Sequence, residues 1–279
     1  MAKKQLIVTA DDFGAAVSVN EAIELAHRSG ILSTTCLLVG GLAADDAVAR
    51  AKRMPALRVG LHVAVTDARP VLDPSQIPLL VDREGQLPLT LLRSGFAFYF
   101  QPAVRAQLQD EIRAQFAAFA RTGLALDHVN GHNHIHIHPT VQELILDIGK
   151  EYGLRAMRVP YEPFGPSWRS AHDDLAARFG LGVGLLPMIG AMRSRLRRGG
   201  IKANDYLFGI CDTGRMTAAR TLEILHQLPD GISEIHFHPA TARWPGMPST
   251  ARCEEELAAL TNPKIAQAVD DLGIQPATF

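Results

Sequence analysis

A dense group of histidines is the part of this sequence best suited to chemistry. Five of the eleven histidines fall within residues 128–138. From His132 to His138 they alternate with other residues, and because strand side chains alternate between faces, we expect one strand with four imidazoles on the same side. Clustered imidazoles bind Zn, Fe or Ni, and alongside carboxylates also Mg or Mn. The segment therefore predicts a metal site, with a polar barrel interior or a solvated edge as the alternative.

Two adjacent carboxylates could complete such a site. Asp11 and Asp12 follow the apolar run of residues 5–10, and a buried carboxylate pair is costly without a cation. Because the two side chains point in different directions, one could bind a metal while the other takes a proton. The alternative is that Asp12 only caps the helix that follows.

Histidines outside the dense group supply the remaining roles. His62 follows an apolar stretch and alone would be read as a core histidine. With the Asp pair and the histidine strand it makes an Asp-His-His site, whose open positions admit water and substrate. Such a metal, whether Mg, Mn, Co or Zn, lowers the pKa of water and polarises a carbonyl, while a second carboxylate can act as general base. His238 is a candidate donor of the proton that a leaving amine needs, or else a purely structural histidine.

Alternating strands and helices must bring these residues together. This alternation predicts an α/β fold, a parallel sheet or barrel with helices outside, and function in such folds gathers at the carboxyl ends of the strands. No repeat or linker divides residues 1–279, so we expect a single domain. Besides the histidine strand, the predicted strands are residues 5–10, 33–39, 58–63, 154–160 and 233–238, and the predicted helices are residues 18–29, 43–54, 102–122, 140–152 and 217–227.

Composition narrows the class of protein. A chain of 279 residues that is 47% hydrophobic with a formal charge of -1 can bury a large core and does not look like a nucleic-acid binder. No apolar stretch reaches the roughly 20 residues of a membrane span, and the N-terminus lacks a signal-peptide core, so we expect a cytoplasmic protein. Cys36, Cys211 and Cys253 are far apart, which predicts small core residues rather than disulfides or a thiolate zinc site. A serine hydrolase is disfavoured because no Gly-x-Ser-x-Gly elbow occurs.

Four motifs of this sequence resemble those of the YdjC-like carbohydrate deacetylases. They are residues 9–14, residues 60–62, the His-x-His-x-His run and His238-Pro239. The resemblance implies a distorted (β/α) barrel of the polysaccharide-deacetylase-like type, which removes acetyl groups from N-acetylglucosamine-containing sugars with one divalent metal ion.

Matching these motifs position by position implies a role for each site residue. Asp12, His62 and His132 would be the metal ligands, Asp11 the general base and His238 the acid. Many family members carry Asp where this chain has Asn130, which can form hydrogen bonds but supplies no charge. His134 is expected to line the site, whereas His136 and His138 are expected behind the ligands or at the surface.

Residues 127–140 and 152–163 resemble more closely the subgroup associated with hopanoid biosynthesis. That resemblance implies a substrate in which N-acetylglucosamine is attached to a bacteriohopane lipid. Arg155 and Arg158 could hold substrate oxygens, or pair with acids such as Glu162. The alternatives are a deacetylase of soluble chito-oligosaccharides and a non-catalytic, metal-stabilised sugar-binding component.

Two apolar stretches flanked by arginines could contact a membrane or a second copy of the protein. Residues 181–192 precede a run with four arginines, and residues 96–100 follow Arg93. Such segments can lie on an anionic membrane, which would give peripheral contact at the inner membrane surface. A core helix or a dimer helix with a basic end is the alternative, and the general frequency of two-fold dimers suggests a homodimer.

Overall fold

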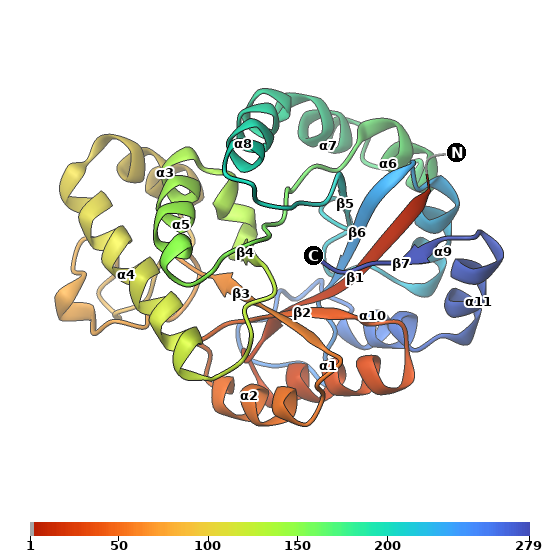
Figure 1. Ribbon diagram of the computed structural model, residues 1–279, viewed down its shortest axis with the longest axis horizontal. Helices are drawn as coiled ribbons and strands as arrows, with labels where there is room; N and C mark the ends of the chain where they lie inside the picture. Colours follow the sequence, from red (N-terminus) through yellow and green to blue (C-terminus); the bar gives the residue numbers. More distant parts are fainter. Residues whose placement is uncertain (1–2) are drawn as a thin grey trace.

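A curved, fully parallel sheet forms the centre of the molecule. The computed structural model describes residues 3–279. The order of its main strands is β4-β3-β2-β1-β6-β5, and the short β7 pairs with the start of β1 (Figure 1). The predicted α/β architecture is confirmed. The strands are β1 (Lys4–Phe13), β2 (Thr34–Leu37), β3 (Arg58–Val63), β4 (Val129–Gly131), β5 (Tyr206–Phe208), β6 (Gly231–Phe237) and β7 (Gln275–Pro276).

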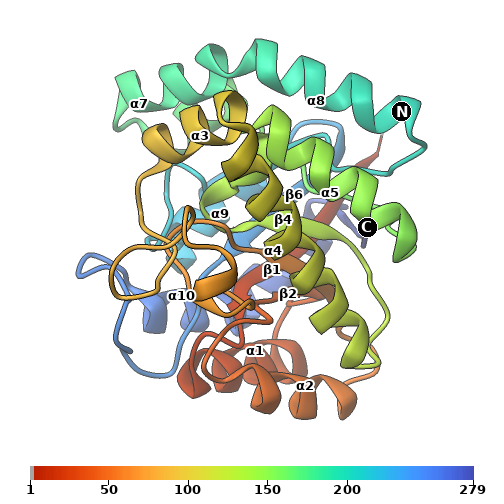
Figure 2. The same ribbon diagram turned by 90° about the vertical axis from the view of Figure 1, so that its left-hand side faces the viewer.

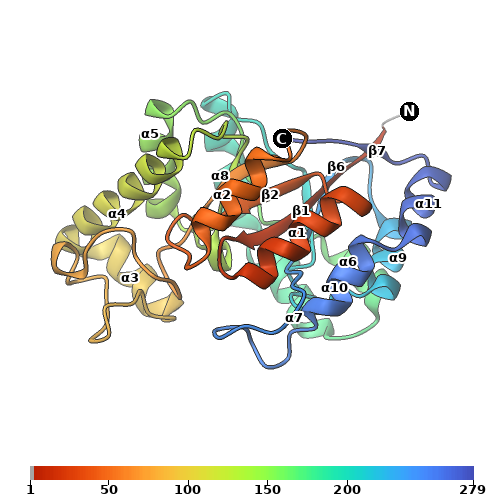
Figure 3. The same ribbon diagram turned by 90° about the horizontal axis from the view of Figure 1, so that it is seen from below.

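All five predicted helices are present and surround the sheet. Each presents an apolar face to one continuous hydrophobic core, as α4 does with Val104, Leu108 and Ile112 at helical spacing. Figure 3 shows α1 and α2 lying across β1 and β2. The five are α1 (Val17–Ser29), α2 (Ala44–Lys52), α4 (Pro102–Arg121), α5 (Pro139–Glu151) and α9 (Ala218–Gln227).

The structure adds helices beyond the five predicted ones, and one of them, α8 (Leu186–Arg198), overlaps residues 181–192, for which a helix was the alternative interpretation. Among the described residues no single helix is long and apolar enough to cross a membrane. Residues Leu175–Gly184 and Leu186–Arg198, which meet at a bend of 40°, together have the length and the apolar composition of a membrane span. Figure 2 shows α3, α7 and α8 along one side of the molecule. The added elements are α3 (Leu91–Phe100), α6 (Phe164–Ala171), α7 (Leu175–Phe179), the π-helical turn η3 (Gly180–Gly184), α8 (Leu186–Arg198), α10 (Cys253–Leu260), α11 (Pro263–Asp271) and the 3₁₀ turn η1 (Pro74–Gln76).

The strand predicted over residues 154–160 is only partly formed. Single bridges join Met157 to Val129 of β4 and Ala156 to Lys202. Further along, the Leu207 N–H of β5 donates to the Tyr161 carbonyl. This extended segment therefore lies between β4 and β5 in the wall of the barrel without a regular ladder.

The predicted histidine strand is wrong beyond Gly131. β4 ends there because β3 ends at its partner, Val63, and leaves no neighbouring backbone to pair with. The chain instead forms a 3₁₀ turn, η2 (His132–Ile137), in which Asn133 and His134 have φ of 52° and 54°. The imidazoles consequently do not share one face.

Candidate metal centre

Asp12, His62 and His132 converge at the carboxyl ends of three strands. Asp12 Oδ1 lies 3.1 Å from His132 Nδ1 and 3.4 Å from His62 Nε2, and the two nitrogens are 3.4 Å apart. Ligand atoms about 2.1 Å from a tetrahedral metal lie roughly 3.4 Å from one another. The three donor atoms therefore have the spacing and the chemistry of a divalent-metal site with open positions.

A β-bulge turns both aspartates of β1 toward the site. The pairing of β1 with β2 shifts between Ala10 and Phe13, and Asp12 adopts a left-handed φ of 65°. Regular strand geometry would send neighbouring side chains to opposite faces, whereas bulges re-aim them and occur often beside active sites. Asp11 and Asp12 consequently line the same cavity.

Hydrogen bonds orient His62, whereas His132 faces a carboxylate at a longer distance. His62 and Asn130 are paired across β3 and β4, and His62 Nδ1 lies 2.6 Å from Asn130 Oδ1 and 3.2 Å from Cys36 Sγ. Ligation through Nε2 leaves the ring hydrogen on Nδ1, so the Asn130 oxygen then accepts it. On His132, Nε2 faces the Asp67 carboxylate at 4.0 Å.

The ligands polarise one another. Burial disfavours the charged form of Asp12, but the neighbouring His132 and His62 outweigh this and hold its pKa well below the ordinary value. Burial likewise opposes protonation of His132, yet the Asp12 carboxylate raises the pKa of that imidazole. The lowered pKa of Asp12 and the raised pKa of His132 indicate that this position favours a negative carboxylate beside a positive charge, as a bound cation would provide.

Asp11 is held by a buried ion triad. Arg158 donates from Nη1 and Nη2 to the two Asp11 oxygens at 2.6 and 2.8 Å, and Nη2 also donates to Glu234 Oε1 at 2.6 Å. Arg158 has no exposed surface, and Asp11 is 2% exposed. Burial favours the neutral form of Asp11, but the Arg158 charge dominates and keeps its pKa well below normal. Arg158 thus pairs with acids, but with Asp11 and Glu234 rather than with Glu162.

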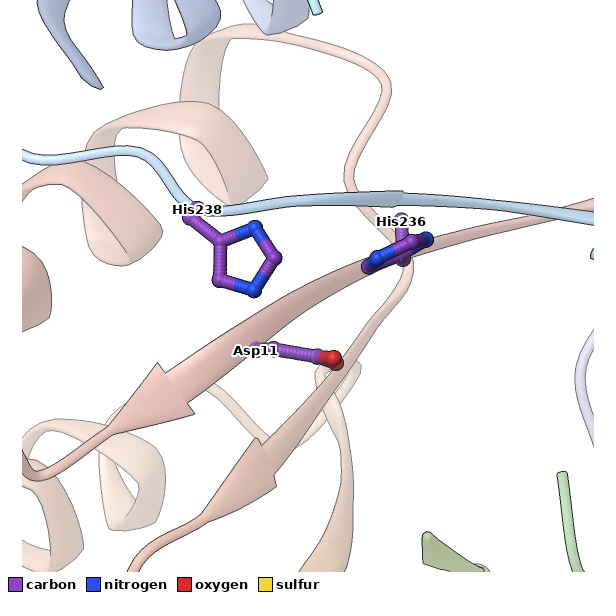
Figure 4. A group of neighbouring side chains, drawn as sticks. All are labelled: Asp11, His236 and His238. Atoms are coloured by element: carbon purple, nitrogen blue, oxygen red, sulfur yellow. The ribbon is translucent and has the colours of Figure 1, made fainter. Parts of the chain in front are cut away.

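His238 faces Asp11 from the neighbouring strand end. Figure 4 shows the rings of His236 and His238, on and just after β6, directed at Asp11 on β1. Each of the three residues offers an atom within 4.8 Å of the others. The buried Glu256 fixes this segment, because its Oε2 accepts the His238 backbone N–H at 2.5 Å. Asp11 and His238 are therefore placed to exchange protons with one small molecule.

A cavity of about 350 Å³ opens over these groups. Its polar end carries the three candidate ligands with Asp11, Asp67 and His238, and the rest of its wall is largely apolar. The apolar wall includes Val19, Leu38, Val39, Leu42, Val71, Trp244, Met247 and Pro248.

Other residues singled out in the sequence lie away from the cavity wall. His134 packs against His236 with ring centroids 5.2 Å apart, and His136 is fully buried with Nε2 3.1 Å from the Arg158 carbonyl. His138 lies under α3, near Phe98. Arg155 is exposed and is not among the cavity residues.

Three members of the site had no signal in the sequence patterns. Cys36 is a buried core residue as expected, but its thiol also donates to Asp11 Oδ1 at 3.1 Å. Glu234 lies within an apolar strand, and Asp67 lies in a loop with a left-handed φ of 53°. Only strand register brings Cys36 and Glu234 beside Asp11, and local sequence patterns do not show register.

The chain is similar in sequence to two carbohydrate deacetylases and in fold to a solved structure. The chain is 37% identical over 279 residues to a carbohydrate deacetylase of Brevibacillus brevis, covering 99% of this chain and 98% of that protein. A carbohydrate deacetylase of Geobacillus stearothermophilus is 29% identical over 277 residues, covering 98% and 96%. An Enterococcus faecalis V583 protein, named as a candidate for cellobiose-phosphate cleavage, has the same fold, with a TM-score of 0.77 at 20% identity over 99% of this chain and 98% of that one.

The family assignment follows from full-length similarity. Residues 5–271 match the family described as YdjC-like protein. Since this match spans nearly the whole chain and the Brevibacillus relative is 37% identical along it, the chain belongs to the YdjC-like protein family.

Proposed function

We propose that this protein is a metal-dependent carbohydrate N-deacetylase. The observation that carries the proposal is the Asp12-His62-His132 triad, which shares one cavity with a second carboxylate, Asp11, and with His238. The similarity to two relatives named carbohydrate deacetylase supports it. Mg, Zn, Mn and Co all suit a site of one carboxylate and two imidazoles.

The reaction is the hydrolysis of an acetamide. A divalent ion held by Asp12, His62 and His132 would supply Lewis acidity to the acetyl carbonyl and to the attacking water. Asp11 accepts the proton that water loses as its oxygen adds to the carbonyl carbon. His238 donates a proton to the nitrogen as the C–N bond breaks, giving acetate and a free amine.

Arg158 keeps Asp11 ionised and fixed in place. Its two hydrogen bonds to Asp11 leave this carboxylate a weak base, and a metal held by Asp12, His62 and His132 would supply the acidity that lets water give up its proton. The apolar cavity wall can receive the acetyl methyl group, and Trp244 offers a ring on which a sugar can stack.

The substrate we propose is an N-acetylglucosaminyl hopanoid lipid. The motifs of residues 127–140 and 152–163 support this choice, as does the exposed Leu42, 84% accessible at the rim of the cavity. Deacetylation of soluble chito-oligosaccharides is the second candidate, because the names of the two curated relatives specify a carbohydrate and no lipid.

Acetate release tests both candidates. Metal-stripped protein is reloaded with Mg, Mn, Co or Zn and incubated with N-acetylglucosaminyl-bacteriohopanetetrol or with diacetylchitobiose. Turnover of the lipid alone supports the proposal, and turnover of chitobiose alone replaces the substrate but keeps the chemistry. No acetate from either would favour a non-catalytic sugar-binding role.

Substitution of the base separates binding from chemistry. Asp11→Asn should lower turnover by roughly 10²- to 10⁴-fold because it removes the proton acceptor. Metal content, measured by plasma mass spectrometry, should stay at the wild-type level because Asp11 is not a ligand. Acetate release at the wild-type rate would show that another group is the base.

A further inference from the structure

Exposed large apolar side chains are concentrated in two segments of the chain. Of fourteen such side chains among the described residues, eleven fall in residues 79–100 and 175–186. Leu92 is 93% exposed, and Phe96 and Phe100 are 62% and 61% exposed. Large exposed apolar patches of this kind mark interaction sites. We call the following set the docking face: Leu92, Phe96, Tyr99 and Phe100 of α3, with Leu175, Phe179, Val183 and Leu186 of α7 to α8.

The docking face belongs to segments that carry positive charge alone. Residues 85–109 and 175–204 contain no Asp or Glu, although the chain has 29 acidic residues. Arg93 on α3 and Arg197 and Arg198 in the last turn of α8 are exposed. The acids that precede α7, Asp173 and Asp174, are within ion-pair distance of arginines.

This positive charge favours an anionic lipid surface over a second copy of the protein as the partner. In a two-fold dimer the same patch meets itself, which would place arginines against arginines. An anionic lipid surface instead attracts each nearby cation by roughly 1 kcal/mol while apolar side chains enter the interface. The α8 helix buries Ile189, Met192 and Leu196 against the protein, so only its outer face is free for a membrane. The segment therefore fits a helix lying on the bilayer rather than one crossing it.

The docking face lies on the same side of the molecule as a loop that lines the cavity. Figures 2 and 3 show α3 and α7 on the same side of the molecule as the loop between β6 and α10, which supplies Trp244 and Met247 to the cavity. Beneath α3, the rings of Phe98 and Tyr99 contact His138 at centroid distances of 6.1 and 6.4 Å. His138 directly follows the turn η2, which begins with the ligand His132.

We infer that α3 and α7 to α8 form the surface by which the protein docks on an anionic membrane. The inference deepens the proposed function, because a lipid-linked sugar would be presented at that surface. Only this link to the substrate rests on the proposed function. The docking itself is carried by the exposed apolar side chains and the unopposed arginines.

Vesicle co-sedimentation of the full-length, metal-loaded protein tests the inference. We expect binding to vesicles of phosphatidylcholine with phosphatidylglycerol and little binding to phosphatidylcholine alone. Phe96→Ser combined with Phe100→Ser should lower the partition coefficient roughly tenfold or more, because two aromatic rings no longer leave water. Arg197→Gln with Arg198→Gln should lower it severalfold and weaken its salt dependence. Leu25→Ser, on α1 and 45% exposed in the wild type, is the matched control that should change nothing.

Several results would overturn the inference. They are a wild-type protein that stays in the supernatant with anionic vesicles, an α3 double variant that binds like wild type, and a wild-type dimer in sedimentation velocity that the same variant dissociates. Turnover of diacetylchitobiose by the α3 variant reports on the catalytic site separately. Vesicle binding without any acetate release would contradict the proposed function and leave the docking inference standing.

Discussion

Asn130 occupies the position that determines how His62 presents its nitrogen. Its side chain reaches His62 Nδ1 at 2.6 Å, and turned over, its oxygen would accept from Arg158 Nη1 at 2.9 Å. Only the first orientation leaves His62 Nε2 free for a metal. A neutral amide thus does the orienting that a carboxylate does in many metal sites.

Removing this contact should weaken metal binding. Asn130→Ala is expected to raise the dissociation constant for Co²⁺ by about 10- to 100-fold, because the His62 ring loses its partner. Asn130→Asp should bind Co²⁺ at least as well as wild type. Titration followed by visible absorption measures both, and equal affinity for the alanine variant would show that Asn130 does not orient the ligand.

Arg158 neutralises two buried acids at once. Arg158→Met leaves Asp11 and Glu234 without a counter-charge, so we expect the free energy of unfolding of metal-free protein to fall by about 3–5 kcal/mol in urea denaturation. Adding Asp11→Asn and Glu234→Gln to Arg158→Met should recover part of that loss. If the triple variant is no more stable than the single one, uncompensated charge is not the cause.

At the scale of elements, β3 can approach the start of β4 closely because Gly60 has no side chain. A Cβ at Gly60 would lie 2.5 Å from His128 Cε1 and 2.7 Å from the His128 carbonyl oxygen. Gly60 pairs with Cys36 of β2 and stands two positions before His62, so a shift there displaces a ligand.

Gly60→Ala should therefore affect both stability and metal binding. We expect a loss of about 1–3 kcal/mol in the free energy of unfolding, typical of overpacking, together with weaker Co²⁺ binding. Gly190→Ala on α8 is the matched control, because a Cβ there meets nothing within 4 Å and alanine favours helix. A Gly60→Ala protein as stable as wild type would mean that His128 moves aside without cost.

Elements differed in how far the sequence predicted them. The five predicted helices appear within a few residues of their expected bounds. The apolar spacing that predicts a helix such as α4 involves residues only three or four positions apart, so it can be read from the local sequence. The histidine strand failed because a strand needs a partner, and the partner β3 ends at Val63. Alternation alone does not show where the neighbouring strand stops.

At the scale of the whole molecule, buried neutral histidines make stability depend on pH. Burial is the largest influence on His136 and His236 and lowers the pKa of each to about 3. Both groups regain an ordinary pKa near 6.5 on unfolding. Unfolding therefore takes up protons below pH 6.5, and the stability present above that pH is lost as the pH falls toward 3.

The slope of this loss can be measured. Each histidine should reduce the free energy of unfolding of metal-free protein by roughly 1.4 kcal/mol per pH unit once the pH is well below 6.5. In His136→Gln the amide can still donate to the Arg158 carbonyl. Between pH 6 and 5 the slope of unfolding free energy against pH should fall by an amount that corresponds to about one proton. Urea denaturation at a series of pH values measures this, and an unchanged slope would place the protonation elsewhere.

The sequence by itself determined the inventory of chemistry and the kind of scaffold. The motifs around Asp11, Asp12, His62, His132 and His238, and the alternation of strands and helices, were sufficient to predict an α/β sheet with polar groups at its carboxyl ends. These signals are local, because periodicity and motifs extend over a few residues.

Only the tertiary structure decided how those groups act together. Asp11 meets Arg158 147 positions away, His62 meets Asn130 68 positions away, and a bulge in β1 turns two neighbouring aspartates into one cavity. Strand register and the loss of water around buried charges set these contacts, and both depend on the whole chain being folded. The same holds for the docking face, since side chains of α3 and α8 are exposed or buried according to what packs beneath them.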